Sequence, residues 1–281
     1  MAVSRTLPVV AVVLVAAACS GSGGGGGRPR VVASFFPLAE AAERVGGDAV
    51  EVDDLTPAGT EPHDVELAAD EVDALLDADL VVYLGGGYQP AVEDVVDERD
   101  GASVDVLDTV DGGDDPHVWL DPTAMVRIVD AVADGVADVE PDRGGDVQAA
   151  ADRYRVELEQ LDADLAAQLD DCQRDLIVSA HDAFGRLARR YGLRTEAVTG
   201  LSPEAEPDPG RLADLADLVE REGVTTVFTE ELVSPDVAEA LAREADVDTA
   251  VLDPVESRPD GGYVAAMRRN GDALALALGC R

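Results

Sequence analysis

The chain has 281 residues, and its 59 acidic side chains outnumber its 21 basic ones, so its formal net charge is −38. It contains no lysine, and arginine carries all of the side-chain positive charge. Proteins that bind nucleic acids contact phosphates through Lys and Arg, so this balance excludes a nucleic-acid partner. Hydrophobic residues make up 46% of the chain, enough for the cores of two ordinary lobes.

The first residues have the features of a targeting segment. Arg5 supplies a short positive region, and the apolar run 7–18 is too short to span a bilayer comfortably. The sequence "AAAC" ending at Cys19 resembles a bacterial lipobox. We therefore expect a lipoprotein signal peptide over 1–18, a lipid on Cys19 and an extracytoplasmic protein anchored to the cell membrane. Simple secretion or a periplasmic location is the alternative.

Beyond a glycine-rich tether at 19–29, short strands alternate with helices on both sides of one much longer helix. The strands are expected over 30–36, 48–55, 79–85, 103–107, 175–180, 193–198, 224–230 and 247–253. Helices are expected over 37–47, 69–79, 89–99, 122–139, 182–192, 208–223, 234–245 and 261–279. The stretch 146–172 lacks Pro and Gly and keeps an apolar spacing near 3.6, which predicts a rod of roughly 40 Å.

This alternation predicts a parallel α/β fold with two lobes joined by one long rigid helix. We place the N-terminal lobe at 30–141, the linker helix at 142–172 and the C-terminal lobe at 173–281.

All three histidines follow the C-terminal end of an expected strand. His63 comes after 48–55, His117 after 103–107, and His181 directly after 175–180. In open α/β sheets this edge binds ligands. Neutral imidazole is a common ligand of Zn²⁺, and zinc in proteins prefers four donors. The pattern predicts a zinc site.

Asp253 ends the strand 247–253 at the same edge, so we predict it as the fourth ligand. Glu230 ends the strand 224–230 in the same way and is the competitor. If Glu230 is not a ligand, we expect it to orient a histidine, and Glu61 is a further candidate for such a supporting contact. Trp119 either packs beneath the site and limits water access or takes part in ordinary lobe packing. Two ligands from each lobe would place the metal between the lobes.

Two cysteines remain, Cys172 and Cys280, and neither belongs to a CxxC motif. A thiolate zinc site is therefore not expected. Outside the cytosol the two thiols could form a disulfide, with free or separately buried thiols as the alternative.

The histidine segments "TPAGTEPHDVELAADEV", "DPHVWLDP" and "VSAHDAFGRLARRYGL" resemble motifs of the metal-binding receptors of bacterial ABC importers, the ZnuA/TroA-like group. The resemblance extends from about Val31 to the C-terminus. It implies two α/β lobes bridged by a long helix, with metal at their interface. It also implies the ligand set His63, His117, His181 and Asp253, and delivery to a membrane permease driven by a cytoplasmic ATPase. We expect a monomer.

The ligand types bear on the choice of metal. Manganese-selective relatives tend to carry a carboxylate where this chain has His181. Three nitrogens and one carboxylate favour Zn²⁺, with Mn²⁺ as the alternative. Many zinc receptors also carry a histidine-rich loop before the second motif, whereas this chain has the acidic segment "DTVDGGDDP" there.

Two other classes of function remain as alternatives. A secreted zinc-dependent hydrolase could use Glu61, Glu206 or Glu230 as its base, but it needs a metal position open to water, which a fourth protein donor would close. A metal-stabilised surface adhesin is the second alternative, although the sequence has no repeat and no Thr/Pro stalk. We expect a receptor and not an enzyme.

Overall fold

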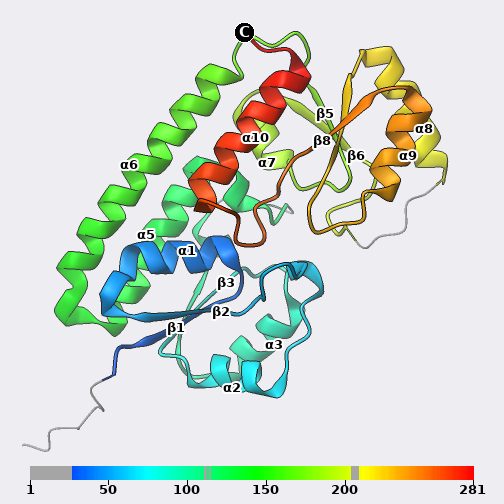
Figure 1. Cartoon of the computed structure of the whole chain (residues 1–281). Helices are drawn as coiled ribbons and strands as arrows, with labels where there is room; N and C mark the ends of the chain where they lie inside the picture. Colours follow the sequence, from blue (N-terminus) through cyan, green and yellow to red (C-terminus); the bar gives the residue numbers. More distant parts are fainter. Residues whose placement is uncertain (1–26, 111–112, 114, 204–208) are drawn as a thin grey trace, which may run out of the picture.

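The computed structural model describes residues 27–110, 113, 115–203 and 209–281. Within them, eight strands form two parallel sheets that lie one above the other in Figure 1. The expected signal peptide, Cys19 and Glu206 lie outside the described residues. None of the helices in the described ranges is long and apolar enough to cross a membrane.

The first sheet has the order β2-β1-β3-β4. Its strands are β1 (Arg30–Ala33), β2 (Glu51–Asp54), β3 (Leu80–Tyr83) and β4 (Ala102–Asp105). Val31 of β1 pairs with Val52 on one side and Leu80 on the other. The two central strands are continuous apolar runs, as expected where helices cover both faces of a sheet.

The second sheet repeats this plan with the order β6-β5-β7-β8. Its strands are β5 (Leu176–Ser179), β6 (Arg194–Ala197), β7 (Thr226–Thr229) and β8 (Asp248–Val251). The two sheets confirm the expected two-lobed parallel α/β fold. The exact lobe boundaries stay a prediction.

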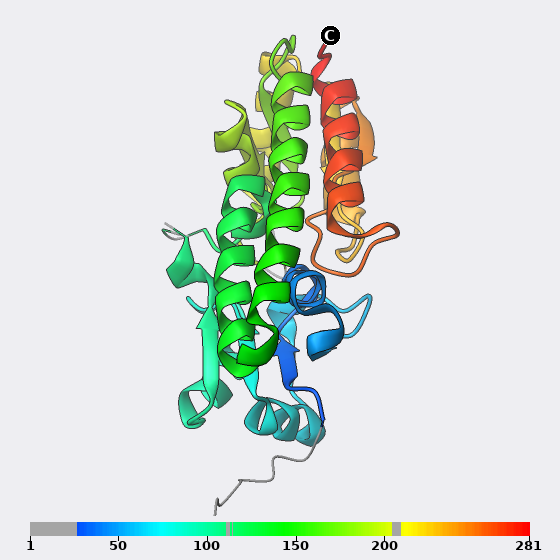
Figure 2. The same ribbon diagram turned by 90° about the vertical axis from the view of Figure 1, so that its left-hand side faces the viewer.

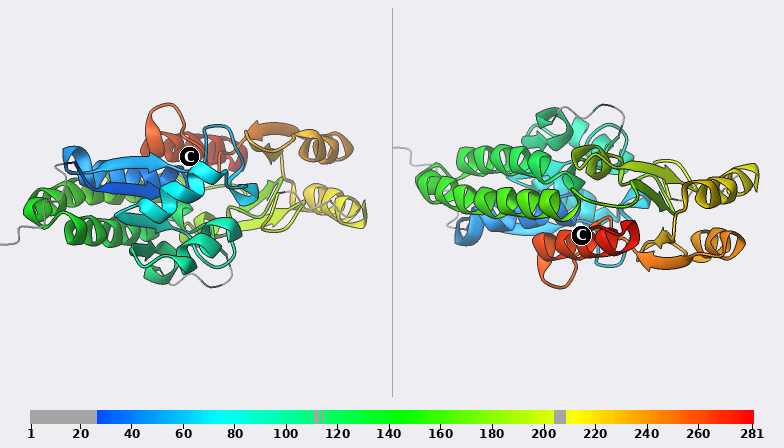
Figure 3. Two further views of the ribbon diagram at one scale, coloured as in Figure 1. Left: turned by 90° about the horizontal axis from the view of Figure 1, so that it is seen from below. Right: turned by 90° about the horizontal axis from the view of Figure 1, so that it is seen from above.

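Helices surround both sheets. In the first half of the chain they are α1 (Phe36–Gly46), α2 (Ala69–Asp77), α3 (Pro90–Glu98), α4 (Val106–Thr109) and α5 (Pro122–Val139). In the second half they are α7 (Gly185–Arg190), α8 (Pro209–Glu222), α9 (Asp236–Ala245) and α10 (Gly262–Leu278). In the views of Figure 3, α5 and α6 lie at one side of the molecule and α8 and α9 at the other.

The long helix α6 (Gly144–Gln168) has 25 residues, so at 1.5 Å per residue it is about 37 Å long. Its buried side chains recur every three or four residues and form one stripe: Val147, Ala151, Tyr154, Leu158, Leu161 and Leu165. Figure 2 shows α6 alongside α5 and α10, and both helices contact it. The helix ends four residues before the expected position, at Gln168.

The core is continuous between the lobes. One cluster of buried side chains includes Val31 in β1, Ile128 in α5, Leu158 in α6, Phe184 before α7 and Met267 in α10. Separating the lobes would expose part of this cluster to water, at about 25 cal/mol for each Å² of apolar surface. The lobes are therefore joined by shared packing as well as by α6.

A disulfide joins Cys172 and Cys280, which are 108 residues apart in sequence. Cys172 follows α6, and Cys280 follows α10. Of the two alternatives that the sequence left open, the structure has the paired form.

Candidate metal centre

The three histidines lie at the carboxyl ends of strands, on short segments that fix their backbones. His63 is in a 3-10 turn (Pro62–Asp64) after β2. His117 precedes a second 3-10 turn (Val118–Leu120), and His181 comes two residues after β5 ends. The side chains of His117 and His181 are fully buried, and that of His63 is 9% exposed.

Each histidine is fixed through its backbone by a carboxylate. In the segments Glu61-Pro-His63 and Asp115-Pro-His117, the acid two residues earlier accepts the histidine backbone N–H at 3.2 and 3.1 Å, respectively. Asp115 also lies 3.1 Å from Nδ1 of the His117 ring. The proline between acid and histidine limits the backbone further. The local sequence thus presents each imidazole in a narrow range of orientations.

His181 has the same kind of partner from a distant element. Glu230, which directly follows β7, accepts the His181 backbone N–H at 3.1 Å through Oε1. Its Oε2 lies 2.5 Å from Nδ1 of the imidazole. Burial alone would lower the pKa of His181, but the hydrogen bond and the charge of Glu230 outweigh it and raise that pKa above its ordinary value.

The three imidazoles converge with a carboxylate. One donor atom from each of His63, His117, His181 and Glu256 lies within 4.8 Å of the other three. The ring centroids of the histidines are 5.3 to 6.0 Å apart. Glu256 Oε1 lies 3.6 Å from His63 Nε2 and 3.9 Å from His117 Nε2.

The fourth member of the donor group differs from the residue that the sequence predicts. Asp253 is not a member of the four-donor group, and Glu256, three residues later, is. The Oδ1 atom of Asp253 accepts the backbone N–H of Val255 at 2.7 Å, and the residue lines a separate pocket of about 120 Å³. Glu230, the predicted competitor, lies outside the group as well and contacts His181 as described above.

The inner atoms of the four side chains have few protein partners. Nε2 of each histidine and Oε2 of Glu256 are buried and have no hydrogen-bond partner among the described residues. Buried polar atoms are rarely left unpaired in native proteins. Together with the Glu256 carboxylate, whose Oε1 lies 3.6 Å from His63 Nε2, the three Nε2 atoms match the donors of a tetrahedral Zn²⁺ site.

Burial keeps two of the imidazoles neutral at neutral pH. It lowers the pKa of His63 to about 4 and also lowers the pKa of His117. Burial raises the pKa of Glu256 to about 7, and burial together with the charge of Glu256 raises the pKa of Glu61 to about 7. The site is thus short of positive charge to pair with its carboxylates, which a divalent cation would supply.

Aromatic rings form a wall beside the donors. Trp119 is fully buried, and its ring centroid lies 5.3 Å from that of His117. Tyr88 lies 4.4 Å from His63 by the same measure, and its hydroxyl donates to Glu256 Oε1 at 3.4 Å. Both rings come from the N-terminal half and limit the access of water to the donors.

The segment that carries Glu256 is fastened to the N-terminal lobe. Ser257 Oγ accepts the backbone N–H of Gly59 at 2.9 Å, and Arg258 forms an ion pair with Glu43 at 2.8 Å. Two members of the donor group thus come from each half of the chain, as expected. The fourth donor comes from the C-terminal half of the chain but is held against the N-terminal lobe.

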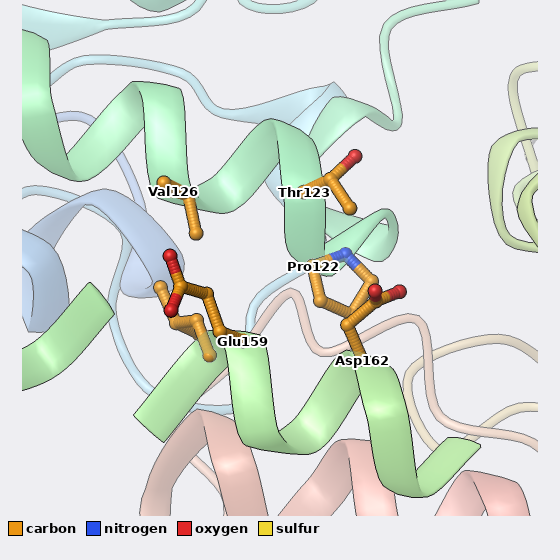
Figure 4. A pocket seen from close by; sticks show the side chains of 6 residues that line it. Pro122, Thr123, Val126, Glu159 and Asp162 are labelled. Carbon is orange, nitrogen blue, oxygen red and sulfur yellow. The ribbon is translucent and has the colours of Figure 1, made fainter. Parts of the chain in front are cut away.

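A pocket of about 220 Å³ lies elsewhere, between α5 and α6 (Figure 4). It is lined by Pro122, Thr123, Val126, Leu158, Glu159 and Asp162. It holds none of the histidines and is not part of the metal centre.

Known proteins with similar sequences and structures include zinc-binding proteins. Residues 31–277 match the family model described as ZnuA, zinc-uptake complex component A, periplasmic. The chain belongs to this family. The match includes all four members of the donor group and both sheets, apart from Arg30 at the start of β1.

Among relatives, the zinc-binding lipoprotein AdcA of Streptococcus pneumoniae is 32% identical over 273 residues, which cover 87% of this chain and 54% of AdcA. The chain thus spans about half the length of the first curated relatives that it matches. The crystal structure of the Zn(II)-bound ZnuA-like domain of S. pneumoniae AdcA has a TM-score of 0.78 and 34% identity, with 90% of this chain and 99% of that chain covered.

The laminin-binding protein Lmb of Streptococcus agalactiae is similar in structure too, with a TM-score of 0.83, 27% identity, and 89% of this chain and 99% of that chain covered. It is described as a bifunctional protein with adhesin and metal-transporting activity.

Proposed function

We propose that the protein is an extracytoplasmic receptor that captures Zn²⁺ and delivers it to the membrane permease of an ABC importer, whose cytoplasmic ATPase drives uptake. The observation that carries the proposal is the convergence of one carboxylate with three imidazoles whose Nε2 atoms have no hydrogen-bond partner in the described residues. The family to which the chain belongs supports the transport role.

The donor set favours zinc over manganese. Three nitrogens and one carboxylate oxygen suit Zn²⁺, whereas Mn²⁺ prefers a larger share of oxygen donors. Mn²⁺ is the alternative cargo. Both ions would contact the same four side chains, so a competition between the two metals for the zinc-free protein measures the preference.

Anchoring and oligomeric state complete the proposal. Acylation of Cys19 would keep the receptor at the outer surface of the membrane, and the tether at 19–29 would let it reach the permease. Mass spectrometry of the membrane-extracted protein tests the lipid. We propose a monomer, which size-exclusion chromatography with light scattering tests.

A zinc-dependent hydrolase and a surface adhesin are the alternative functions. Four protein donors fill a tetrahedral zinc site and leave no position for the activated water that a hydrolase needs. Adhesion, described for Lmb, would use an outer surface and not the buried donors. The receptor is therefore the function that the site supports best.

The direct test is zinc binding by purified, metal-stripped protein, in competition with a chromophoric chelator. The change of any one histidine to alanine (His63→Ala, His117→Ala or His181→Ala) should raise the Kd for zinc by more than the ~10–100-fold typical of losing a supporting contact. Glu159→Gln, in the pocket of Figure 4, is the control and should leave the Kd unchanged.

The same variants test transport. Proteoliposomes that contain the permease and ATPase should import zinc with the parent protein and fail to do so with His181→Ala. Parent-like zinc binding by any of the three histidine variants would overturn the proposed site. Tight zinc binding without import would overturn the receptor role.

A further inference from the structure

The segment between β8 and α10 carries Glu256, and the three residues before it are each held by hydrogen bonds. The Asn270 side chain on α10 brackets Asp253: Oδ1 accepts the backbone N–H at 2.9 Å, and Nδ2 donates to the backbone C=O at 2.6 Å. Trp119 Nε1 donates to the C=O of Pro254 at 2.7 Å. The Asp253 carboxylate accepts the N–H of Val255 at 2.7 Å.

These bonds hold an unfavourable backbone conformation. Val255 has φ +59°, in the left-handed region that β-branched residues rarely adopt. A strained backbone conformation of this kind persists only where the contacts around it hold it in place. The turn at Val255 sets the direction in which the next residue, Glu256, leaves the backbone. Contacts that hold the turn therefore hold the carboxylate among the imidazoles.

An asparagine side chain can make both of these hydrogen bonds to the Asp253 backbone. It is the only asparagine in a chain with 59 acidic residues, and its side chain is 2% exposed. An amide offers an acceptor and a donor together, whereas an aspartate offers only acceptors. A carboxylate at position 270 would leave the C=O of Asp253 without its partner and add a negative charge to a buried region.

We propose that Asn270 is a positioning residue for metal binding, which acts by fixing Asp253 and the turn at Val255 so that Glu256 points at the three histidines. The inference rests on the proposed function, because the position of Glu256 affects binding only if the ion sits among those donors. It also assigns Asp253 a part in shaping the turn.

The test uses the full chain loaded with Co²⁺, whose visible spectrum depends on the number and type of its ligands. Asn270→Asp keeps the size of the side chain and removes the donor, and Asn270→Leu removes both hydrogen-bonding groups. Both should change the cobalt spectrum in the same way as Glu256→Gln and raise the Kd for zinc at least about tenfold. The double variant Asn270→Asp/Glu256→Gln should bind zinc no more weakly than Glu256→Gln alone, because both changes remove the same ligand.

Thr225→Val is the control. It removes another side-chain hydrogen bond to α10, from Thr225 Oγ1 to the C=O of Ala277, at the other end of the helix. It should leave the spectrum and the Kd unchanged, and thermal unfolding of the metal-free proteins checks that each variant folds.

Three results would overturn the proposal. They are a parent-like cobalt spectrum in a folded Asn270 variant, losses of affinity that add fully in the double variant, and failure of both Asn270 variants to fold, which would make the residue a general stabiliser. These results differ from a failure of the proposed function, in which His63→Ala would bind zinc like the parent.

Discussion

Glu230 contacts His181 twice, with Oε2 2.5 Å from the imidazole Nδ1 and Oε1 accepting the backbone N–H at 3.1 Å. The first contact occupies Nδ1, so Nε2 is the atom left to face the other donors. A carboxylate on the far nitrogen of a metal-binding histidine fixes its tautomer and strengthens it as a ligand. The contact with Glu230 thus leaves His181 Nε2 oriented toward the other donors, as a metal ligand would be.

Glu230→Gln should weaken zinc binding by about 10–100-fold. The amide oxygen can still accept one N–H, but the charge that favours a metal-bound imidazole is lost. Chelator competition at pH 7.5 measures the change. Glu231→Gln alters the neighbouring, exposed acid and is the matched control. Equal affinities for Glu230→Gln and the parent would show that this contact does not support the ligand.

Zinc binding should weaken as the pH falls from about 8 to about 5.5, because protons compete for the donors. In the zinc-free protein the contact with Glu230 outweighs burial and raises the pKa of His181 above 6.5, and burial raises that of Glu256 to about 7. Zinc requires both groups deprotonated, so affinity is full above these pKa values and is lost as the pH falls through them. His63, with a pKa of about 4, adds no competition in this range.

The slope of log Kd against pH counts the protons displaced, so it should be smaller in Glu256→Gln, which lacks one titrating group, than in the parent. Titrations at fixed ionic strength measure it. A Kd that stays constant across this range would contradict the assignment of His181 and Glu256 as ligands.

Comparing Glu256→Gln with Asp253→Asn tests which of the two acids is the fourth zinc ligand. Glu256→Gln removes the carboxylate that lies among the imidazoles, so the Kd for zinc should rise at least about tenfold. Asp253→Asn keeps an oxygen to accept the Val255 N–H and should change the Kd less than threefold. The reverse order of effects would restore Asp253 as the ligand.

The disulfide should contribute to stability and not to the site. It closes a loop of 108 residues between the ends of α6 and α10, so Cys172→Ala or Cys280→Ala should lower the free energy of unfolding by about 2–5 kcal/mol. Denaturant titrations of the zinc-free proteins measure this loss. The zinc Kd at 25 °C should stay at the parent value, and a large rise would mean that the disulfide also shapes the metal centre.

Most of the fold could be predicted because its signals are local. The central strands of both sheets are short, mostly apolar runs, and seven of the eight strands lie within the predicted ranges, whereas β4 begins one residue earlier, at Ala102. The helix α6 ends at Gln168 and not at 172, since helix ends depend on local packing that periodicity does not reveal. The short helix α4 was missed because four residues are too few to show a period.

Some residues of the candidate site could be predicted from the sequence and others could not. The three histidines were predictable from the rule that parallel strands present ligands at their carboxyl ends. Glu256 was not, because it lies five residues beyond β8 in an irregular segment that makes hydrogen bonds to Asn270 and Trp119, and strand patterns do not reveal such contacts. The prediction favoured Asp253 because that residue marks the end of the strand. The single asparagine and the acid two residues before His117 were the overlooked signals.

The most direct measurement is a crystal structure of the zinc-loaded protein, with anomalous diffraction data at the zinc absorption edge. We expect one strong anomalous peak at about 2.0–2.2 Å from His63, His117, His181 and Glu256, with no thiolate ligand. A peak bound by Asp253 in place of Glu256, or zinc found only at surface carboxylates, would contradict it.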